Sequence, residues 1–235
     1  MGDNPVYVHG LLENEVSPSE IIDTFADLTS ASVEGDDGPL YPYEVRTDGE
    51  YIENRTANLD DVKRVFSDFG NGVLYRSCGE LTIRIGYNMD ERHIPPAPVY
   101  TIGVNAAAFL PDEENELFET DVEDRITNII DLVIQSYLRL QPLYVYGYGA
   151  TPDYGYVSVP DRDAIENGDL PELYWLAVYS PALVSQIGRD RLLSAPAWRT
   201  ERLDDGAVLI VVYQNPRIPG DQYLPGEVET HIRET

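Results

Sequence analysis

The sequence contains almost no lysine. Lys63 is the only one, and lysine and arginine together number 16 against 42 aspartates and glutamates, for a formal net charge of −26. Like charges at this density oppose folding in dilute buffer, whereas in molar salt the Debye length falls to roughly 3 Å and screens them. The aliphatic part of a lysine side chain exposes apolar surface, whereas the carboxylates of aspartate and glutamate are compact. Arginine is retained where its planar guanidinium group pairs with carboxylates. The composition predicts a protein from an extreme halophile.

An acidic surface has a second explanation, which is mimicry of nucleic acid or capture of a basic partner. Proteins of that kind gather their charge on one face, whereas acidic residues here extend from Asp3 to Glu234. We therefore assign most of the acidity to adaptation to the solvent. The sequence also lacks a basic stripe, which argues against direct DNA or RNA binding.

Cysteine, histidine and long apolar runs are scarce as well. Cys78 is the single cysteine, which excludes an internal disulfide and a cysteine-built zinc site, and we interpret it as a small core residue. His9, His93 and His231 lack the spacing of metal ligands, and His93 is expected in a solvated loop. No apolar run reaches the ~18 residues of a membrane span, and no signal-peptide pattern is present. We expect a cytoplasmic protein without membrane association.

Catalytic signatures are absent too. The sequence contains no GxxxxGK[ST], no GxGxxG opening a helix, no GxSxG and no HExxH. Lys63 is the only candidate for lysine chemistry, and it is expected to be solvated on the polar side of a helix. The acidic stretch 112–124 lacks the glycine of a calcium loop. The sequence predicts a non-enzymatic protein with no catalytic residue, no metal and no cofactor.

Capping residues and apolar residues at helical spacing predict five helices. Ser17, Pro18 and Glu20 form the pattern of an N-cap, a first-turn proline and a capping glutamate. Thr120 and Glu123 form a capping box before the longest helix, which should lie across a sheet. The five helices are predicted to begin at Ser17, Asn58, Thr120, Ser180 and Asp190.

Between these helices the apolar period changes to two, which predicts strands. Residues 72–79 and 80–87 form a hairpin, with Thr82 and Arg84 on the same face of the second strand. Further strands are predicted within residues 98–109, 143–149, 172–180 and 206–215. Strands in antiparallel pairs, interrupted irregularly by helices, predict an α+β fold: a mostly antiparallel sheet with helices packed on one face.

The domain organisation follows from two acidic, proline-rich stretches, 34–43 and 148–171, which are the candidate linkers. A single domain over residues 1–235 is the simpler interpretation. A subdivision near residue 160 is the alternative.

Tyrosine is abundant, with 17 tyrosines against 5 phenylalanines. Tyr144, Tyr146 and Tyr148 alternate along a predicted strand and should project from one face, and Tyr154 and Tyr156 repeat the spacing. Their rings can pack while their hydroxyls stay wet, as at protein interfaces. The alternative is that tyrosine replaces phenylalanine at the margin of the core. These five residues are the candidate binding surface.

Residues 172–216 combine a tryptophan-bearing strand, a proline-started helix that ends at glycine, the pattern Arg-x-x-Leu-Leu-Ser-Ala-Pro, and a glycine turn into a buried strand. The residues that form this pattern are Trp175, Pro181, Gly188, Leu192, Leu193, Pro196, Gly206 and Pro216. The block resembles the type VI immunity family of bacterial and archaeal proteins. Its residues also have structural explanations, since Trp175 can anchor a core, Gly188 can cap a helix in the left-handed conformation and Gly206 can turn a hairpin.

The resemblance implies a small cytoplasmic protein that neutralises a cognate toxin by protein–protein contact. The alternative is a structural or accessory protein of a halophilic virus or a cellular assembly, in which the same sheet forms a homo-oligomer interface. An enzyme ranks third, because Cys78, His93 and scattered carboxylates do not define a reaction.

Overall fold

The computed structural model describes residues 5–12, 16–31, 33–35, 38–47, 50–88, 99–111, 118–149, 162–167, 173–217 and 225–233. The strands are β1 Val6–Leu12, β2 Ser30–Ala31, β3 Val33–Gly35, β4 Gly38–Thr47, β5 Glu50–Ala57, β6 Gly72–Cys78, β7 Leu81–Tyr87, β8 Val99–Val104, β9 Pro142–Tyr148, β10 Leu176–Tyr179, β11 Arg199–Arg202 and β12 Val208–Val211. The helices are α1 Pro18–Leu28, α2 Leu59–Phe69, η1 Ala106–Phe109, α3 Val122–Leu140, α4 Arg162–Glu166, α5 Pro181–Ile187, α6 Arg189–Leu193 and α7 Pro225–Arg233.

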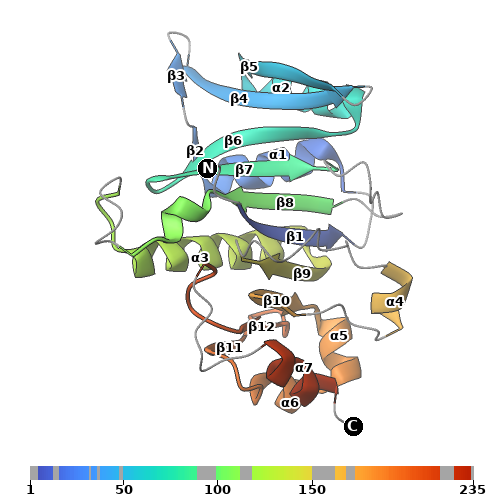
Figure 1. Cartoon of the computed structure of the whole chain (residues 1–235). Helices are drawn as coiled ribbons and strands as arrows, with labels where there is room; N and C mark the ends of the chain where they lie inside the picture. Colours follow the sequence, from blue (N-terminus) through green and yellow to red (C-terminus); the bar gives the residue numbers. More distant parts are fainter. Residues whose placement is uncertain are drawn as a thin grey trace.

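The described strands form one 12-stranded sheet in the order β11-β12-β10-β9-β1-β8-β7-β6-β4-β3, with β2 paired to β6 and β5 to β4. Every pairing between them is antiparallel. Figure 1 shows the strands stacked from the β4–β5 hairpin at one end to β11 at the other. The predicted α+β class with a mostly antiparallel sheet is confirmed.

The strand β1 joins the two halves of the sheet, because it pairs with β8 on one side and with β9 on the other. No strand was predicted for the residues of β1. Its segment VYVHGLL alternates small apolar residues with larger ones, and Val6 and Val8 are buried. One further strand, β10, then pairs with β9 and carries the sheet into the C-terminal third.

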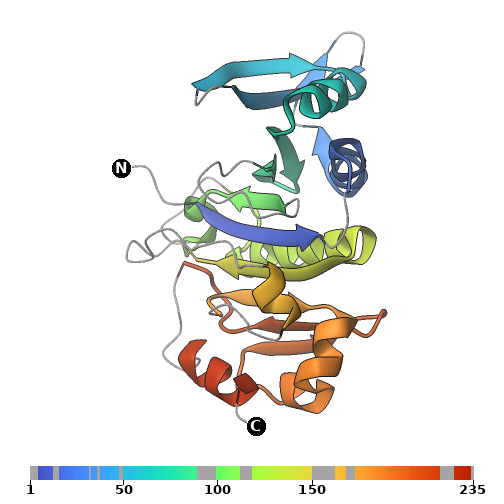
Figure 2. The same cartoon turned by 90° about the vertical axis from the view of Figure 1, so that its right-hand side faces the viewer.

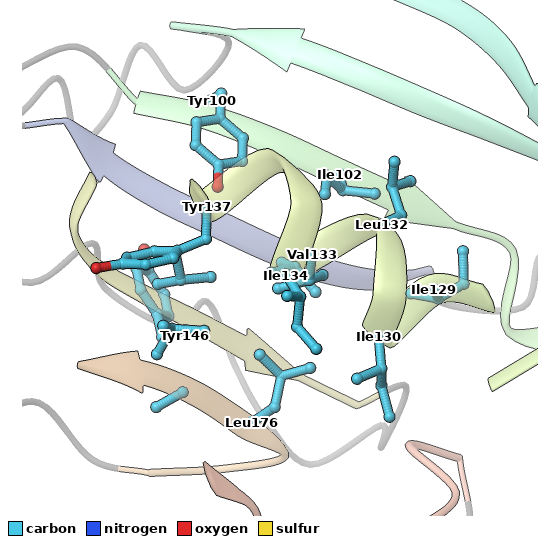
Figure 3. Packing of buried hydrophobic residues seen from close by; sticks show 14 of the residues in the cluster. Tyr100, Ile102, Ile129, Ile130, Leu132, Val133, Ile134, Tyr137, Tyr146 and Leu176 are labelled. Carbon is cyan, nitrogen blue, oxygen red and sulfur yellow. The ribbon is translucent and has the colours of Figure 1, made fainter. Parts of the chain in front are cut away.

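Three helices cover one face of the sheet. α1, α2 and α3 lie along the same side of the strands in Figure 2. Figure 3 shows α3 lying over β8, β1 and β9, with Ile129, Val133 and Tyr137 among the residues that it presents to the core. All three of these side chains are fully buried. The long amphipathic helix predicted to lie across a sheet does so.

The C-terminal end of the sheet is covered on its other face as well. Every residue of β10 and of β12 is buried, so both sides of these strands need cover. Thr200 of β11 lies on the face opposite α3 and donates from Oγ1 to the Leu193 carbonyl of α6, at 2.9 Å. The expectation of helices on one face thus holds for α1–α3, while α6 and α7 cover the opposite face at this end.

The helix boundaries follow the predicted caps at α1 and α2. Ser17 Oγ accepts from the Glu20 amide at 3.2 Å, and Asn58 Oδ1 accepts from the Asp61 amide at 2.9 Å. Gly70 ends α2 in the left-handed conformation, with φ 68°.

The predicted capping box of α3 is wrong. Asp121 occupies the N-cap position, one residue later than predicted. The Thr120 amide and hydroxyl both donate to Glu80 Oε2, at 3.1 Å each, and the Glu119 amide donates to the same oxygen at 3.0 Å. A carboxylate from the β6–β7 turn therefore binds the segment just before α3, and the N-cap residue Asp121 makes no side-chain cap hydrogen bond.

The predicted linkers need revision. Within the first stretch, residues 34–35 lie in β3 and residues 38–43 lie in β4, and these two strands pair with each other. Most of the stretch 148–171, including the subdivision predicted near residue 160, lies outside the described residues. The sheet is nevertheless continuous across that interval, because β9 and β10 pair along their length. A single domain stays a prediction, as does the boundary.

Two arginines, Arg76 and Arg125, are buried and donate hydrogen bonds to backbone carbonyls. Arg76 donates to the carbonyls of Ala26 and Thr29, at 3.0 and 2.6 Å, at the C-terminal end of α1. Arg125 donates to the carbonyls of Ala108, at 2.8 Å, and Thr120. Arg76 thus departs from the expectation that arginine pairs with carboxylates, because the free carbonyls at the C-terminal end of α1 are already acceptors with partial negative charge.

Candidate functional site

The sheet face opposite α1–α3 carries side chains in register across five strands. Residues paired directly in an antiparallel sheet project to the same side. The pairing aligns Tyr75 of β6 with Arg84 of β7, Arg84 with Gly103 of β8, Gly103 with Tyr7 of β1, and Tyr7 with Tyr148 of β9. We call these five residues the cross-sheet row. Arg84 is exposed, and Tyr7, Tyr75 and Tyr148 are half-buried.

At one end of the row, hydrogen bonds hold Arg84 in place. The Tyr75 hydroxyl donates to Glu44 Oε1 at 2.8 Å and accepts from Arg84 Nη2 at 3.0 Å. The Arg84 guanidinium carbon also lies 5.4 Å from the centroid of the Tyr75 ring, within cation–π range. Burial is the main cause that raises the pKa of Tyr75, so its hydroxyl stays protonated and can donate to Glu44.

In the middle of the row, Gly103 leaves room for the Tyr7 ring. A Cβ atom at Gly103 would lie 3.1 Å from Tyr7 Cε1 and 3.5 Å from Arg84 Cβ. The ring of Tyr7 therefore lies across β8, next to the stem of Arg84. Burial alone would lower the pKa of Arg84, but its hydrogen bond to Tyr75 and the nearby Tyr7 and Glu44 raise it overall.

Next to the row, His9 of β1 has defined partners for both ring nitrogens. Nδ1 lies 2.9 Å from Thr101 Oγ1, and Nε2 lies 3.3 Å from the Tyr148 hydroxyl. The imidazole stacks on Tyr146, with centroids 5.1 Å apart, and on Tyr148, at 5.5 Å. Because hydroxyls both donate and accept, these contacts suit either tautomer and fix the orientation of the ring.

The tyrosines predicted as a binding surface divide into two groups. Tyr144, Tyr146 and Tyr148 share one face of β9, as predicted, and the rings of Tyr144 and Tyr146 stack at 6.0 Å. Tyr148 is half-buried. Tyr154 and Tyr156 lie outside the described residues. The interface role of these residues stays a prediction.

The expectation of wet hydroxyls is wrong for Tyr144 and Tyr146, whose hydroxyls are both buried. The Tyr144 ring lies 5.4 Å from the ring of Tyr179 on β10. Burial raises the pKa of Tyr144 and of Tyr179, and the nearby Glu229 of α7 acts in the same direction on both. The helices over β10 and β12 thus cover the C-terminal half of this sheet face. The other half, which carries the cross-sheet row, remains accessible.

The residues of the predicted family block have structural roles. Trp175 is fully buried and donates from Nε1 to the Tyr213 carbonyl at 3.1 Å. Pro181 is the first residue of α5, as predicted. Both anchor the C-terminal third of the sheet.

The turns of the block also depend on its glycines. Gly206 has φ 95° and its amide donates to the Leu203 carbonyl at 3.0 Å, in the turn between β11 and β12. Gly188 follows α5 with φ 105° and ψ 120°, which is not the left-handed helical conformation that we predicted. Pro196 is exposed after α6. None of these residues approaches the cross-sheet row in the sheet pairing.

Sequence reasoning missed most of the row. It placed Arg84 on the face that also carries Thr82, which is correct, but it found no signal in Tyr7 and His9. The usable signal was the alternation in residues 6–12, where Val6 and Val8 are buried and Tyr7 and His9 project to the other side. A strand predicted there would have placed Tyr7 and His9 together on the face opposite Val6 and Val8.

Metal and thiol chemistry find no support in the described residues. They contain no group of three or more histidine, cysteine or acidic side chains that could hold a metal ion. Cys78 is half-buried, with Sγ 3.9 Å from the Asn128 carbonyl, and burial raises the pKa of its thiol. His93 and residues 112–117 lie outside the described part of the chain. Among the described helices, none is long and apolar enough to cross a membrane.

The fold and the row describe an antiparallel α+β protein with one partly accessible sheet face. No protein-family model matches the sequence, and no curated protein matches it either. Among solved structures, the chain is similar to the Pseudomonas aeruginosa type VI secretion system (T6SS) protein PA0821. The TM-score is 0.51 at 11% sequence identity, over 97% of this chain and 72% of that chain. At this identity the likeness shows a shared fold.

Proposed function

We propose that this chain is a non-enzymatic binding protein of the immunity type, which neutralises a cognate toxin by protein–protein contact. Two likenesses support the proposal: the immunity-family pattern over residues 172–216, and the fold shared with a protein of a type VI secretion system. The observation that carries it is the cross-sheet row, where half-buried tyrosines and an exposed arginine lie together on a sheet face.

The row has the properties of a protein-binding surface. Tyrosine offers a large rigid ring and a polar hydroxyl, and arginine is enriched at interfaces for similar reasons. Hydrogen bonds already hold the side chains of Tyr75, Arg84, His9 and Tyr148. Because they are ordered before binding, they lose less conformational entropy when a partner covers them.

The solvent decides which interactions supply the affinity. A net charge of −26 would steer a basic toxin toward the protein in dilute buffer. In the molar salt of the cytoplasm that we propose for this protein, long-range steering is screened, since the Debye length is only roughly 3 Å. Close contacts at the row therefore supply the specificity.

The test is a binding assay with the product of the adjacent gene in 2 M KCl. We expect the wild-type chain to retain that product, and Tyr148→Ala to weaken binding at least tenfold while its circular dichroism spectrum stays unchanged. Arg202→Ala is the matched control, because Arg202 is an exposed arginine on β11, outside the row. An adjacent gene that encodes no toxin, together with no partner recovered in high salt, would overturn the proposal.

A structural or accessory role is the second candidate, and the edge of the sheet favours it. Among the described strands, β5 pairs only with β4, so its other edge can receive a strand from another molecule. Light scattering separates the two candidates. A stable homo-oligomer in the absence of any partner favours the structural role, and a monomer that binds one protein favours the immunity role.

A further inference from the structure

We propose that Arg84 anchors a carboxylate-binding site on the cross-sheet row, which an aspartate or glutamate side chain of the protein partner occupies in the complex. The inference rests on the proposed function for the identity of the occupant. The site itself follows from the contacts of Arg84 within this chain.

The guanidinium group of Arg84 is positioned but only partly used. It offers five N–H donors, of which one on Nη2 bonds to the Tyr75 hydroxyl. Nε and Nη1 make no hydrogen bond with a described residue, and Arg84 is exposed. The donors needed for a two-pronged contact with a carboxylate are therefore available.

Other arginines of the chain show what is unusual here. Arg64, Arg139 and Arg199 form ion pairs with Asp61, Asp27 and Glu201, at 2.6, 3.2 and 2.5 Å. Arg84 forms no ion pair with a described residue, although acidic residues outnumber basic ones by 42 to 16 in this chain. Glu44 is near, but its carboxylate is bound to the Tyr75 hydroxyl, which lies between the two groups.

Exposure alone does not distinguish Arg84, because Arg189 and Arg202 are also exposed and make no side-chain hydrogen bond or ion pair with a described residue. Nothing in the described structure orders those two side chains. Arg84 instead has its hydrogen bond to Tyr75 and its position over the Tyr75 ring. A guanidinium that is already ordered loses less entropy when it binds a carboxylate.

The surroundings of Arg84 also favour a contact that withstands salt. Tyr7 lies across Gly103. A Cβ atom at Gly103 would lie within 3.5 Å of both the Tyr7 ring and Arg84 Cβ. A partner that covers Arg84 together with the neighbouring rings of Tyr7 and Tyr75 would exclude water from the contact. Removing water in this way strengthens the charge contact, and salt screens buried pairs much less than exposed ones.

The site can be tested without the partner. In the full chain, the Nε–Hε resonance of Arg84, assigned with Arg84→Lys, is followed by NMR during titration with N-acetyl-glutamate amide. The uncharged N-acetyl-glutamine amide is the control ligand. We expect a saturable shift with the glutamate compound only, and at least fivefold weaker binding in Tyr75→Phe. Equal shifts with both compounds, an equal shift at Arg202, or tighter binding of inorganic phosphate would overturn the inference.

A second arm uses the partner and separates the two proposals. Arg84→Lys keeps the charge but loses the planar fork, and we expect it to weaken partner binding at least tenfold, with Arg202→Lys unchanged. If the partner binds Arg84→Lys as well as wild type, the carboxylate site is wrong and the proposed function stands. If the glutamate compound binds at Arg84 but no protein partner exists, the proposed function is wrong and the site stands.

Discussion

The ammonium group of Lys63 on α2 forms an ion pair with the carboxylate of Asp23 on α1. Its side chain is 22% exposed, and Asp60 lies 3.9 Å away on the same helix. The sequence predicted a solvated side chain, and that is wrong, because α1 and α2 lie side by side on the sheet. The only lysine of the chain thus links two of the three helices on this face.

Replacing Lys63 by glutamine should lower the free energy of unfolding by about 0.5 kcal/mol in 0.1 M salt, the usual size of a partly exposed ion pair. Lys63→Arg should keep most of this contribution to the free energy of unfolding, since arginine retains the positive charge beside Asp23. Urea unfolding measures the difference. In 3 M KCl the gap between Lys63→Gln and wild type should shrink, and a gap that grows with salt would show that packing of the stem matters more than charge.

The whole chain should gain stability from salt. With a net charge of −26, self-repulsion opposes the folded state until ions screen it. We expect the melting temperature to rise steadily between 0.1 and 3 M KCl, as measured by circular dichroism. An uncharged osmolyte at matched osmolarity is the control. A melting temperature that does not depend on KCl would contradict the halophilic interpretation.

Local rules in the sequence predict local structure well and the site poorly. Ser17, Asn58 and Gly70 cap their helices as predicted, because each acts on residues within one helical turn. Thr120 fails because its partner, Glu80, comes from a hairpin far away in the sequence. No local pattern can predict that competition between the helix and a distant carboxylate.

The cross-sheet row shows the same limit more clearly. Tyr7 and Arg84 belong to strands that do not even pair with each other, and β8 lies between them. Their proximity depends on the register of two strand pairings and on the missing side chain of Gly103. The residue types were visible in the sequence, but the strand order was not.

Gly10 of β1 should tolerate no side chain, since a Cβ there would lie 2.1 Å from Cε1 of Tyr100. Tyr100 cannot easily move, because it is buried against Phe25, with ring centroids 5.6 Å apart. We expect Gly10→Ala to cost about 2–3 kcal/mol in chemical unfolding, in the range of overpacked cores.

Gly226→Ala is the matched control for Gly10→Ala. A Cβ at Gly226 meets nothing within 4 Å, and the residue lies in α7, so alanine there should be neutral or stabilising by about 0.5 kcal/mol. Tyr100→Leu should partly rescue Gly10→Ala by making room for the new methyl group. Equal effects of the two alanine substitutions would contradict the tight contact.

Arg76 should stabilise the C-terminal end of α1. It donates from Nε to Thr29 Oγ1 at 2.8 Å and from Nη2 to the carbonyls of Ala26 and Thr29. Arg76→Met leaves these partly buried acceptors without donors, and we expect a loss of about 2–3 kcal/mol in urea unfolding. Arg202→Met, at an exposed site, should change stability by less than about 0.5 kcal/mol. A similar loss in both variants would rule out the capping role.

Tyr144 should make the protein sensitive to alkali. Burial raises its pKa well above 10.0, so the folded state holds the proton that the unfolded chain releases. The stability that depends on this proton is complete below pH 10 and is lost as the pH rises further. Tyr144→Phe should therefore flatten the fall in stability above pH 10. At pH 7 it should be neutral or stabilising by up to about 1 kcal/mol, because the buried hydroxyl has no hydrogen-bond partner among the described residues.

Tyr100→Phe is the informative comparison for Tyr144→Phe. Burial also raises the pKa of Tyr100, but its hydroxyl lies 3.4 Å from Ser136 Oγ. Removing it should flatten the alkaline limb in the same way and, unlike Tyr144→Phe, cost about 1 kcal/mol at pH 7 through the lost hydrogen bond. Guanidinium chloride unfolding at pH 7, 9, 10 and 11 measures both effects. A loss of more than about 1 kcal/mol at pH 7 in Tyr144→Phe would show that its hydroxyl is bonded after all, most directly to the neighbouring Tyr179.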